Sequence, residues 1–216
     1  MKKSIILIIA IATLMVYDSS AQETSTDTRN KLMLGLKAGL NYANVYDAQG
    51  EKFNADAKFG FATGAFVAIP IGKFLGIQPE ILFSQRGFQG TTVIFGNTYD
   101  FTRTTSYIDV PLLFSFKPIE SLSLLAGPQY SFLVNKRDVF SNSTTSIQQE
   151  TAFKNDNIRK NILCLTMGID INLKHIVLGA RAGWDVQENN GDGTSTTPRY
   201  KNVWYQATLG YRFYND

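Results

Sequence analysis

The chain has 216 residues, of which 44% are hydrophobic, 12% aromatic and only 18% charged, so it can bury the core of one folded domain. This composition excludes an intrinsically disordered chain. The formal net charge is +3 and no block of basic residues occurs, which argues against a polyanionic partner such as nucleic acid. The single cysteine, Cys164, excludes an internal disulfide, and the single histidine, His175, excludes a histidine-rich metal site.

The first residues have the three-part layout of a secretory signal peptide. Lys2 and Lys3 precede an apolar run, and small residues follow as far as Ala21. The apolar run of about 12 residues is too short to cross a hydrocarbon layer of ~30 Å, which argues against an uncleaved anchor. We therefore expect a signal peptide at residues 1–21 and a short polar periplasmic tether at residues 22–31.

From residue 32 onward the dominant hydrophobic period is two, which predicts strands. Each segment of about 10 residues matches a tilted strand that crosses a bilayer. The sequence therefore predicts an all-β domain over residues 32–216, an eight-stranded antiparallel transmembrane β-barrel with up-and-down meander order. The expected strands are residues 34–42, 59–69, 75–86, 108–117, 122–132, 163–173, 176–185 and 203–213.

The links between these segments alternate between short and long. Long links are expected at residues 43–58, 87–106, 134–161 and 186–202, and short ones after the second, fourth and sixth segments. This alternation is typical of a barrel in the outer membrane of a Gram-negative cell, with tight periplasmic turns and long external loops. Both termini are then periplasmic, and residues 135–160 are the expected contact region for a surface ligand. Aromatic residues at strand ends are candidates for the interfacial girdles: Tyr42, Phe59, Tyr107, Trp184, Trp204, Tyr205 and Tyr211, with Trp204 on the inward phase.

One face of every segment lacks charged residues, and the other carries them. The charges predicted to point into the lumen nearly neutralise one another: Lys37, Glu80, Arg86, Asp109, Lys117, Asp170, Arg181, Asp185 and Arg212. Because eight strands enclose an interior just wide enough for side chains, the expected lumen is a paired polar core. A narrow polar conduit and a catalytic carboxylate near Glu80 are the alternatives. A soluble barrel with its apolar face inside also stays open at this stage.

Three prolines, Pro79, Pro111 and Pro128, fall inside predicted strands. Each removes a backbone donor, and a closed barrel has no edge on which to place it. We therefore expect bulges at these positions.

The same prolines belong to motifs that resemble those of the PorT-like outer-membrane β-barrel family. The motifs are Ile77-Gln78-Pro79-Glu80-Ile81-Leu82-Phe83-Ser84-Gln85-Arg86-Gly87, Tyr107-Ile108-Asp109-Val110-Pro111-Leu112-Leu113, Ala126-Gly127-Pro128-Gln129-Tyr130 and the first-strand Gly35-Leu36-Lys37-Ala38-Gly39. The resemblance covers nearly all of the mature chain. It implies a small outer-membrane barrel and, through the family's namesake, a link to secretion across the outer membrane.

No motif in the sequence supports a catalytic, cofactor-binding or metal site. Glu188, Asn190, Asp192 and Gly193 imitate half of a calcium loop, but Arg199 stands where that loop requires a bidentate Glu. His175 is expected to be a solvated turn residue and Cys164 a small buried hydrophobe.

The function expected from the sequence is therefore non-enzymatic, with a side-chain-filled lumen and with external loops in binding, structural or secretion-accessory roles. A porin-like channel and a membrane-embedded enzyme are the alternatives. The expected partners are outer-membrane lipids, the barrel-assembly machinery during biogenesis, and a secretion complex or surface ligand at the loops.

Overall fold

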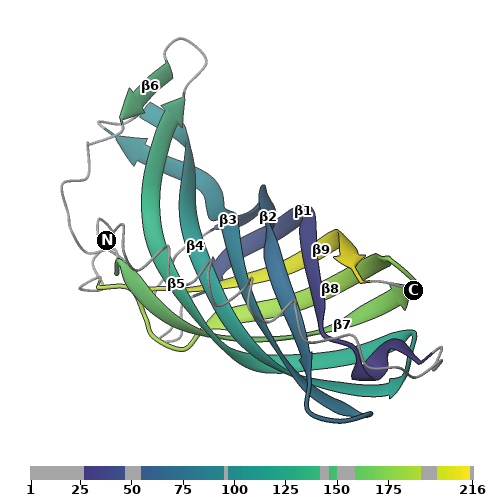
Figure 1. Cartoon of the computed structure of the whole chain (residues 1–216). Helices are drawn as coiled ribbons and strands as arrows, with labels where there is room; N and C mark the ends of the chain where they lie inside the picture. Colours follow the sequence, from purple (N-terminus) through teal and green to yellow (C-terminus); the bar gives the residue numbers. More distant parts are fainter. Residues whose placement is uncertain are drawn as a thin grey trace, which may run out of the picture.

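The computed structural model describes residues 27–46, 55–94, 97–141, 146–149, 159–190 and 199–214. Eight antiparallel strands follow one another around a closed barrel in meander order, as predicted, and β9 returns to pair with β1 (Figure 1). The strands are β1 (Met33–Tyr46), β2 (Asp56–Pro70), β3 (Leu75–Ile94), β4 (Asn97–Ile119), β5 (Leu122–Ser141), β7 (Asn161–Leu173), β8 (Ile176–Asp185) and β9 (Lys201–Phe213). A short ninth strand, β6 (Ser146–Gln149), pairs with the far end of β5. The predicted signal peptide lies outside the described residues.

The outer surface carries a continuous apolar belt, which shows which face of each strand points out of the barrel. Leu36 on β1, Phe114 on β4 and Leu209 on β9 are each more than half exposed, whereas Lys37, Asp109 and Arg212 on the same strands are buried. The belt spans about ten residues of every strand and contains no Lys, Arg, Asp or Glu among the described residues. At a tilt near 45° this corresponds to roughly 23 Å, close to the apolar band of a transmembrane barrel. The apolar face therefore points outward, which excludes the soluble-barrel alternative. No helix in the described part of the chain is long and apolar enough to cross a membrane.

Three strands are much longer than the predicted segments. β3, β4 and β5 have 20, 23 and 20 residues, whereas β8 has 10. β3 loses β2 as a partner beyond Gln89, and β5 loses β7 beyond Phe132. The continuation, residues 90–94, 97–104 and 133–141 together with β6, is called the flap below (Figure 1).

The flap corrects two predicted loops. Residues 87–94 and 97–106 pair as a strand hairpin, and residues 134–141 continue β5. The threonines of residues 102–105 favour a strand because they are β-branched, but both faces of this segment are polar and show no apolar alternation.

Gly87 lies where β3 rises out of the barrel wall. Its φ of 150° is one that residues with a side chain rarely adopt. A Cβ atom there would also lie 2.0 Å from the backbone oxygen of Arg103 on β4. Glycine is therefore required at this position by the close approach of the two strands.

The predicted bulges at the prolines are wrong. The register stays constant across Pro79, Pro111 and Pro128, and the register shifts lie elsewhere, between Ser106 and Tyr107 and at two other places. In an antiparallel ladder each residue bonds to only one neighbouring strand, so one proline removes a single bond. Pairing on both sides of each proline keeps the strands in line.

Candidate functional site: the charged barrel interior

All nine charged residues predicted to face the lumen are buried, with at most 7% of any residue exposed. They do not form one network but separate into a turn-side cluster, a loop-side cluster and two cations at the turn end. The separation follows from strand position, because residues at similar heights on neighbouring strands share a layer.

The turn-side cluster joins Lys37, Glu80, Asp170 and Arg181 from four strands. Lys37 forms an ion pair with Glu80, and Arg181 forms one with Asp170 at 2.7 Å. Gln78 donates to Glu80 at 2.9 Å and to Asp170 at 3.4 Å, which links the two pairs. Two cations and two carboxylates make this cluster neutral, as a low-dielectric interior requires.

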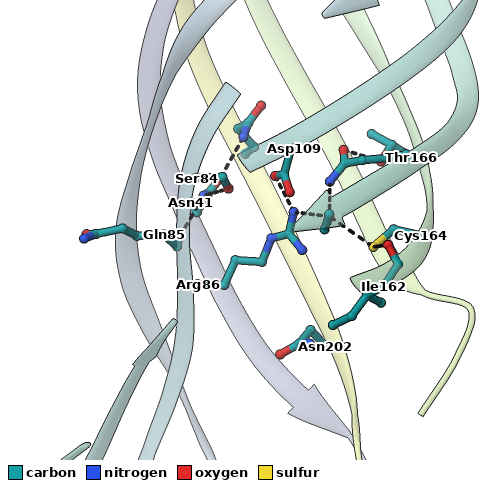
Figure 2. A network of polar contacts seen from close by, with 12 residues as sticks. Asn41, Ser84, Gln85, Arg86, Asp109, Ile162, Cys164, Thr166 and Asn202 are labelled. Carbon is teal, nitrogen blue, oxygen red and sulfur yellow. Dashed lines mark hydrogen bonds and ion pairs between the residues drawn. The ribbon is translucent and has the colours of Figure 1, made fainter. Parts of the chain in front are cut away.

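The loop-side cluster is built around Arg86 (Figure 2). Its guanidinium pairs with Asp109 and stacks on the ring of Trp204, with 3.5 Å between the guanidinium carbon and the ring centroid. The Tyr107 ring lies on the same cation at 4.9 Å. Arg86 thus combines an ion pair with two cation–π contacts in a site that excludes water.

Asp185 completes the loop-side cluster without a cation within ion-pair distance among the described residues. It accepts hydrogen bonds from both the backbone and the side chain of Asn202, and from the Cys164 thiol at 3.3 Å. The same sulfur lies 3.4 Å from the Ser131 hydroxyl. Cys164 was predicted as a small hydrophobe; it is fully buried, as expected, but it also belongs to this polar network.

Uncharged polar residues fill the space between the two clusters. Gln206 donates to Asn41, and Asn41 donates to Ser84, each at 2.9 Å. Thr166 donates to Gln129 at 3.0 Å on the opposite wall. These hydrogen bonds were not predicted from the sequence.

Two predicted girdle residues lie inside the barrel. Tyr107 and Trp204 are 1% and 2% exposed, so neither can reach a membrane interface. Trp204 was already on the inward phase. Tyr107, expected as a girdle residue, has the same strand phase as the inward Asp109, and its ring contacts Arg86. Tyr42, Phe59 and Tyr205 remain exposed, as girdle residues must be.

A fourth ion pair within the barrel, Arg103 with Asp138, lies at the base of the flap. Two hydrogen bonds of 2.8 and 2.9 Å join the guanidinium and the carboxylate, and Arg103 also donates to the Tyr200 hydroxyl at 3.2 Å. Its cation lies over the rings of Phe88 and Phe101. This pair was not predicted, because both residues fall in segments assigned to loops.

The turn end of the barrel is covered by the second half of the predicted tether. Residues Thr28–Asn30 form a 3-10 helix. The Thr28 amide donates to Glu120 at 2.7 Å, and Arg29 donates to the Pro118 carbonyl at 3.2 Å. We call residues 27–31 the N-terminal cap.

The N-terminal cap should dissociate from the barrel in acid. Hydrogen bonding from Arg29 holds the pKa of Asp27 well below its usual value of 3.8. Asp27 also forms an ion pair of 3.4 Å with Lys73 in the β2–β3 turn of the barrel, so its charged form favours docking, and this contribution is lost as the pH falls below 3.8. A nitroxide at Thr28→Cys, in a Cys164→Ser background, should be immobile at pH 7 and become mobile in this acid range.

In Asp27→Asn the same label should already be mobile at pH 7. A spectrum that is independent of pH in the wild-type background, or an immobile label in Asp27→Asn, would contradict the role of this carboxylate.

His175 is not a free solvated residue. Its ring stacks on Tyr211 and Tyr214, with centroids 5.4 and 4.5 Å apart, and its Nδ1 lies 2.9 Å from the Arg212 carbonyl oxygen. Within the described residues, no group of three or more His, Cys, Asp or Glu could hold a metal ion. Asp192 and Gly193 of the calcium-like segment lie outside the described residues.

An outward apolar belt around an inward charged core defines this chain as an integral transmembrane β-barrel. The family described as outer membrane protein beta-barrel domain matches residues 20–184. The chain therefore belongs to this family and is a small outer-membrane β-barrel protein.

Solved structures of similar proteins share low sequence identity with this chain. Ail, the attachment invasion locus protein of Yersinia pestis, is 16% identical with a TM-score of 0.47, over 84% of this chain and 98% of that chain. Neisserial surface protein A is 11% identical with a TM-score of 0.48, over 83% and 97%. OprG from Pseudomonas aeruginosa is 12% identical with a TM-score of 0.41, over 85% and 95%. A comparison with curated proteins gives no match. Similarity at this level says nothing about role.

Proposed function

We propose that the protein is a non-enzymatic outer-membrane barrel with a closed lumen, and that it presents the flap outside the cell as a binding surface. The observation that carries this proposal is the length of β3, β4 and β5 beyond the apolar belt. A strand extension of this size has no role in spanning the bilayer, because the belt alone already matches the bilayer thickness.

The outward face of the flap is mainly polar, as expected for a segment in contact with water. Most of its outward residues are polar, in contrast to the Ile, Leu and Phe of the same strands lower down: Thr91, Asp100, Thr102, Thr104, Asn135 and Arg137, with Val134 and Val139 as the apolar exceptions. The β3 edge beyond Gln89 pairs with no strand other than β4 in the described part of the chain. Free backbone groups on such an edge accept an added strand, which makes an extended peptide a suitable partner.

The interior supports the non-enzymatic part of the proposal. Glu80, the carboxylate singled out in the sequence, is saturated by Lys37 and Gln78. The chain's single histidine stacks between two tyrosines at the turn end rather than beside a nucleophile. A membrane-embedded enzyme would need a base and a nucleophile together at one rim.

The orientation of the barrel can be tested by labelling whole cells. A cysteine at the outward-facing Arg137 of the flap, in a Cys164→Ser background, should react with a membrane-impermeant thiol reagent. A cysteine at Ser121, in the β4–β5 turn, should react only after the outer membrane is permeabilised. Labelling at Ser121 alone in intact cells would mean that the topology is the reverse of the proposed one. Labelling at both positions would mean that the protein does not span a sealed membrane.

A secretion-accessory role is the second candidate, and it rests on the PorT-like motifs. In the structure Gln78, Glu80 and Arg86 of the first motif and Asp109 of the second build the barrel interior. The motifs therefore describe how the lumen is filled and do not identify a partner surface. Co-purification of the tagged protein with secretion components from intact outer membranes, lost on deletion of the flap tip, would favour this role.

A further inference from the structure

Two buried cations at the turn end of the lumen lack a carboxylate partner. Lys117 and Arg212 are each 7% exposed, and neither lies within ion-pair distance of an Asp or Glu in the described part of the chain. Lys117 donates to the Arg29 carbonyl at 3.3 Å, and Arg212 donates to the Lys174 carbonyl. The Nε of Arg212 is buried with no hydrogen-bond partner. Two such charges are costly unless a counter-ion shares their site.

Both cations line one cavity of about 20 Å³. The N-terminal cap closes it from the turn side through Thr28 and Arg29, and Gln78 and Ser123 contribute to its wall. This volume holds one water-sized species. A larger ligand would have to displace the cap.

The local charges leave an excess of one positive charge. Asp170 also lines the cavity, but it is committed to Arg181 within the neutral turn-side cluster. Arg29 is neutralised by Asp27. Lys117 and Arg212 then face Glu120, whose carboxylate accepts the Thr28 amide at 2.7 Å. One small monovalent anion would balance the remaining charge.

We propose that this cavity is a halide-binding site, formed by Lys117 and the free Nε of Arg212 and closed by the N-terminal cap. Chloride fits because it is monovalent, is close to water in size and accepts hydrogen bonds from ammonium and guanidinium groups. The bound anion would hold the two cations together and stabilise the turn end. This inference is independent of what the flap binds.

Bromide reports directly on the site, because it replaces chloride and scatters X-rays anomalously. Crystals of the mature barrel, grown from detergent and soaked in sodium bromide, should show an anomalous peak between the Lys117 Nζ and the Arg212 Nε. Absence of a peak there, with ordered density for both side chains, overturns the proposal.

Thermal unfolding gives a second readout. Relative to sodium gluconate at equal ionic strength, sodium bromide should raise the Tm of the wild-type barrel by roughly 2–4 °C, because an ion that binds the folded state stabilises it. Lys117→Gln should abolish this difference. Arg137→Gln, which removes an exposed cation on the flap, away from the cavity, should retain it. An equal response in the two variants would mean screening rather than binding and would overturn the proposal.

Discussion

Leu112→Arg should prevent most of the protein from folding into lipid vesicles. Leu112 lies at the middle of the outward face of β4 and is 45% exposed, so its side chain contacts lipid rather than protein. An arginine near the bilayer midplane of a barrel costs roughly 2–4 kcal/mol, a large fraction of the stability of a small domain. The folded fraction can be measured by the heat-dependent gel mobility that folded barrels show.

Two control variants separate the effect of a charge on the lipid face from the effect of any substitution in β4. Leu112→Phe keeps an apolar side chain on the lipid face and should fold nearly as well as the wild type. Ser115→Ala changes a buried inward residue of the same strand and should be nearly neutral. Normal folding of Leu112→Arg would mean that this face does not contact lipid.

Asp109→Asn should be the most destabilising single change in the loop-side cluster. The substitution leaves the Arg86 cation buried without its carboxylate, and breaking a buried pair in this way costs about 3–5 kcal/mol. Arg86 cannot turn to solvent, because it is enclosed by Trp204 and Tyr107. Urea unfolding in vesicles would give the change in the free energy of unfolding.

A double-mutant cycle separates pairing from packing. The double variant Arg86→Met with Asp109→Leu should recover much of the stability lost in either single variant, because neither buried charge then remains. Arg137→Gln, an exposed arginine on the flap, should change stability by less than about 0.5 kcal/mol. Additive losses in the double variant would show that Arg86 and Asp109 do not act as a pair.

The barrel itself was predictable because the bilayer imposes a simple pattern on each strand. Leu34, Leu36 and Leu40 alternate with Gly35, Lys37 and Asn41, and this period fixes both the strand and its faces. The strand count, the meander order and the inward charges follow from the same pattern. This pattern does not show which of the two faces points outward, because an apolar face also suits the dry interior of a soluble barrel.

The flap was missed because the pattern disappears above the membrane. In residues 102–106 both faces are polar, so Thr102 and Thr104 look like loop residues, although they are paired with β3 and β5. Only the density of β-branched residues pointed to strands. The Arg103–Asp138 pair was missed for the same reason, since it joins two strands that were not expected there.

Partners within the lumen could not be read from the sequence either. The inward phase identifies Lys37, Glu80, Asp170 and Arg181, but the pairing depends on the stagger between strands, which no local pattern specifies. The error at Tyr107 is of a different kind, because the girdle prediction followed the preference of tyrosine for interfaces although this position shares the inward phase of Asp109.

Single-channel recording most directly tests the central claim that the lumen is a packed charged core. Each charged cluster extends across the barrel, with Lys37 to Asp170 at one height and Arg86 to Asp185 at another. The purified protein, inserted in a planar bilayer and shown to be folded, should therefore give no steady ionic current at physiological voltage. A steady, ohmic conductance from the wild-type barrel would contradict the closed lumen and would favour the narrow porin-like channel.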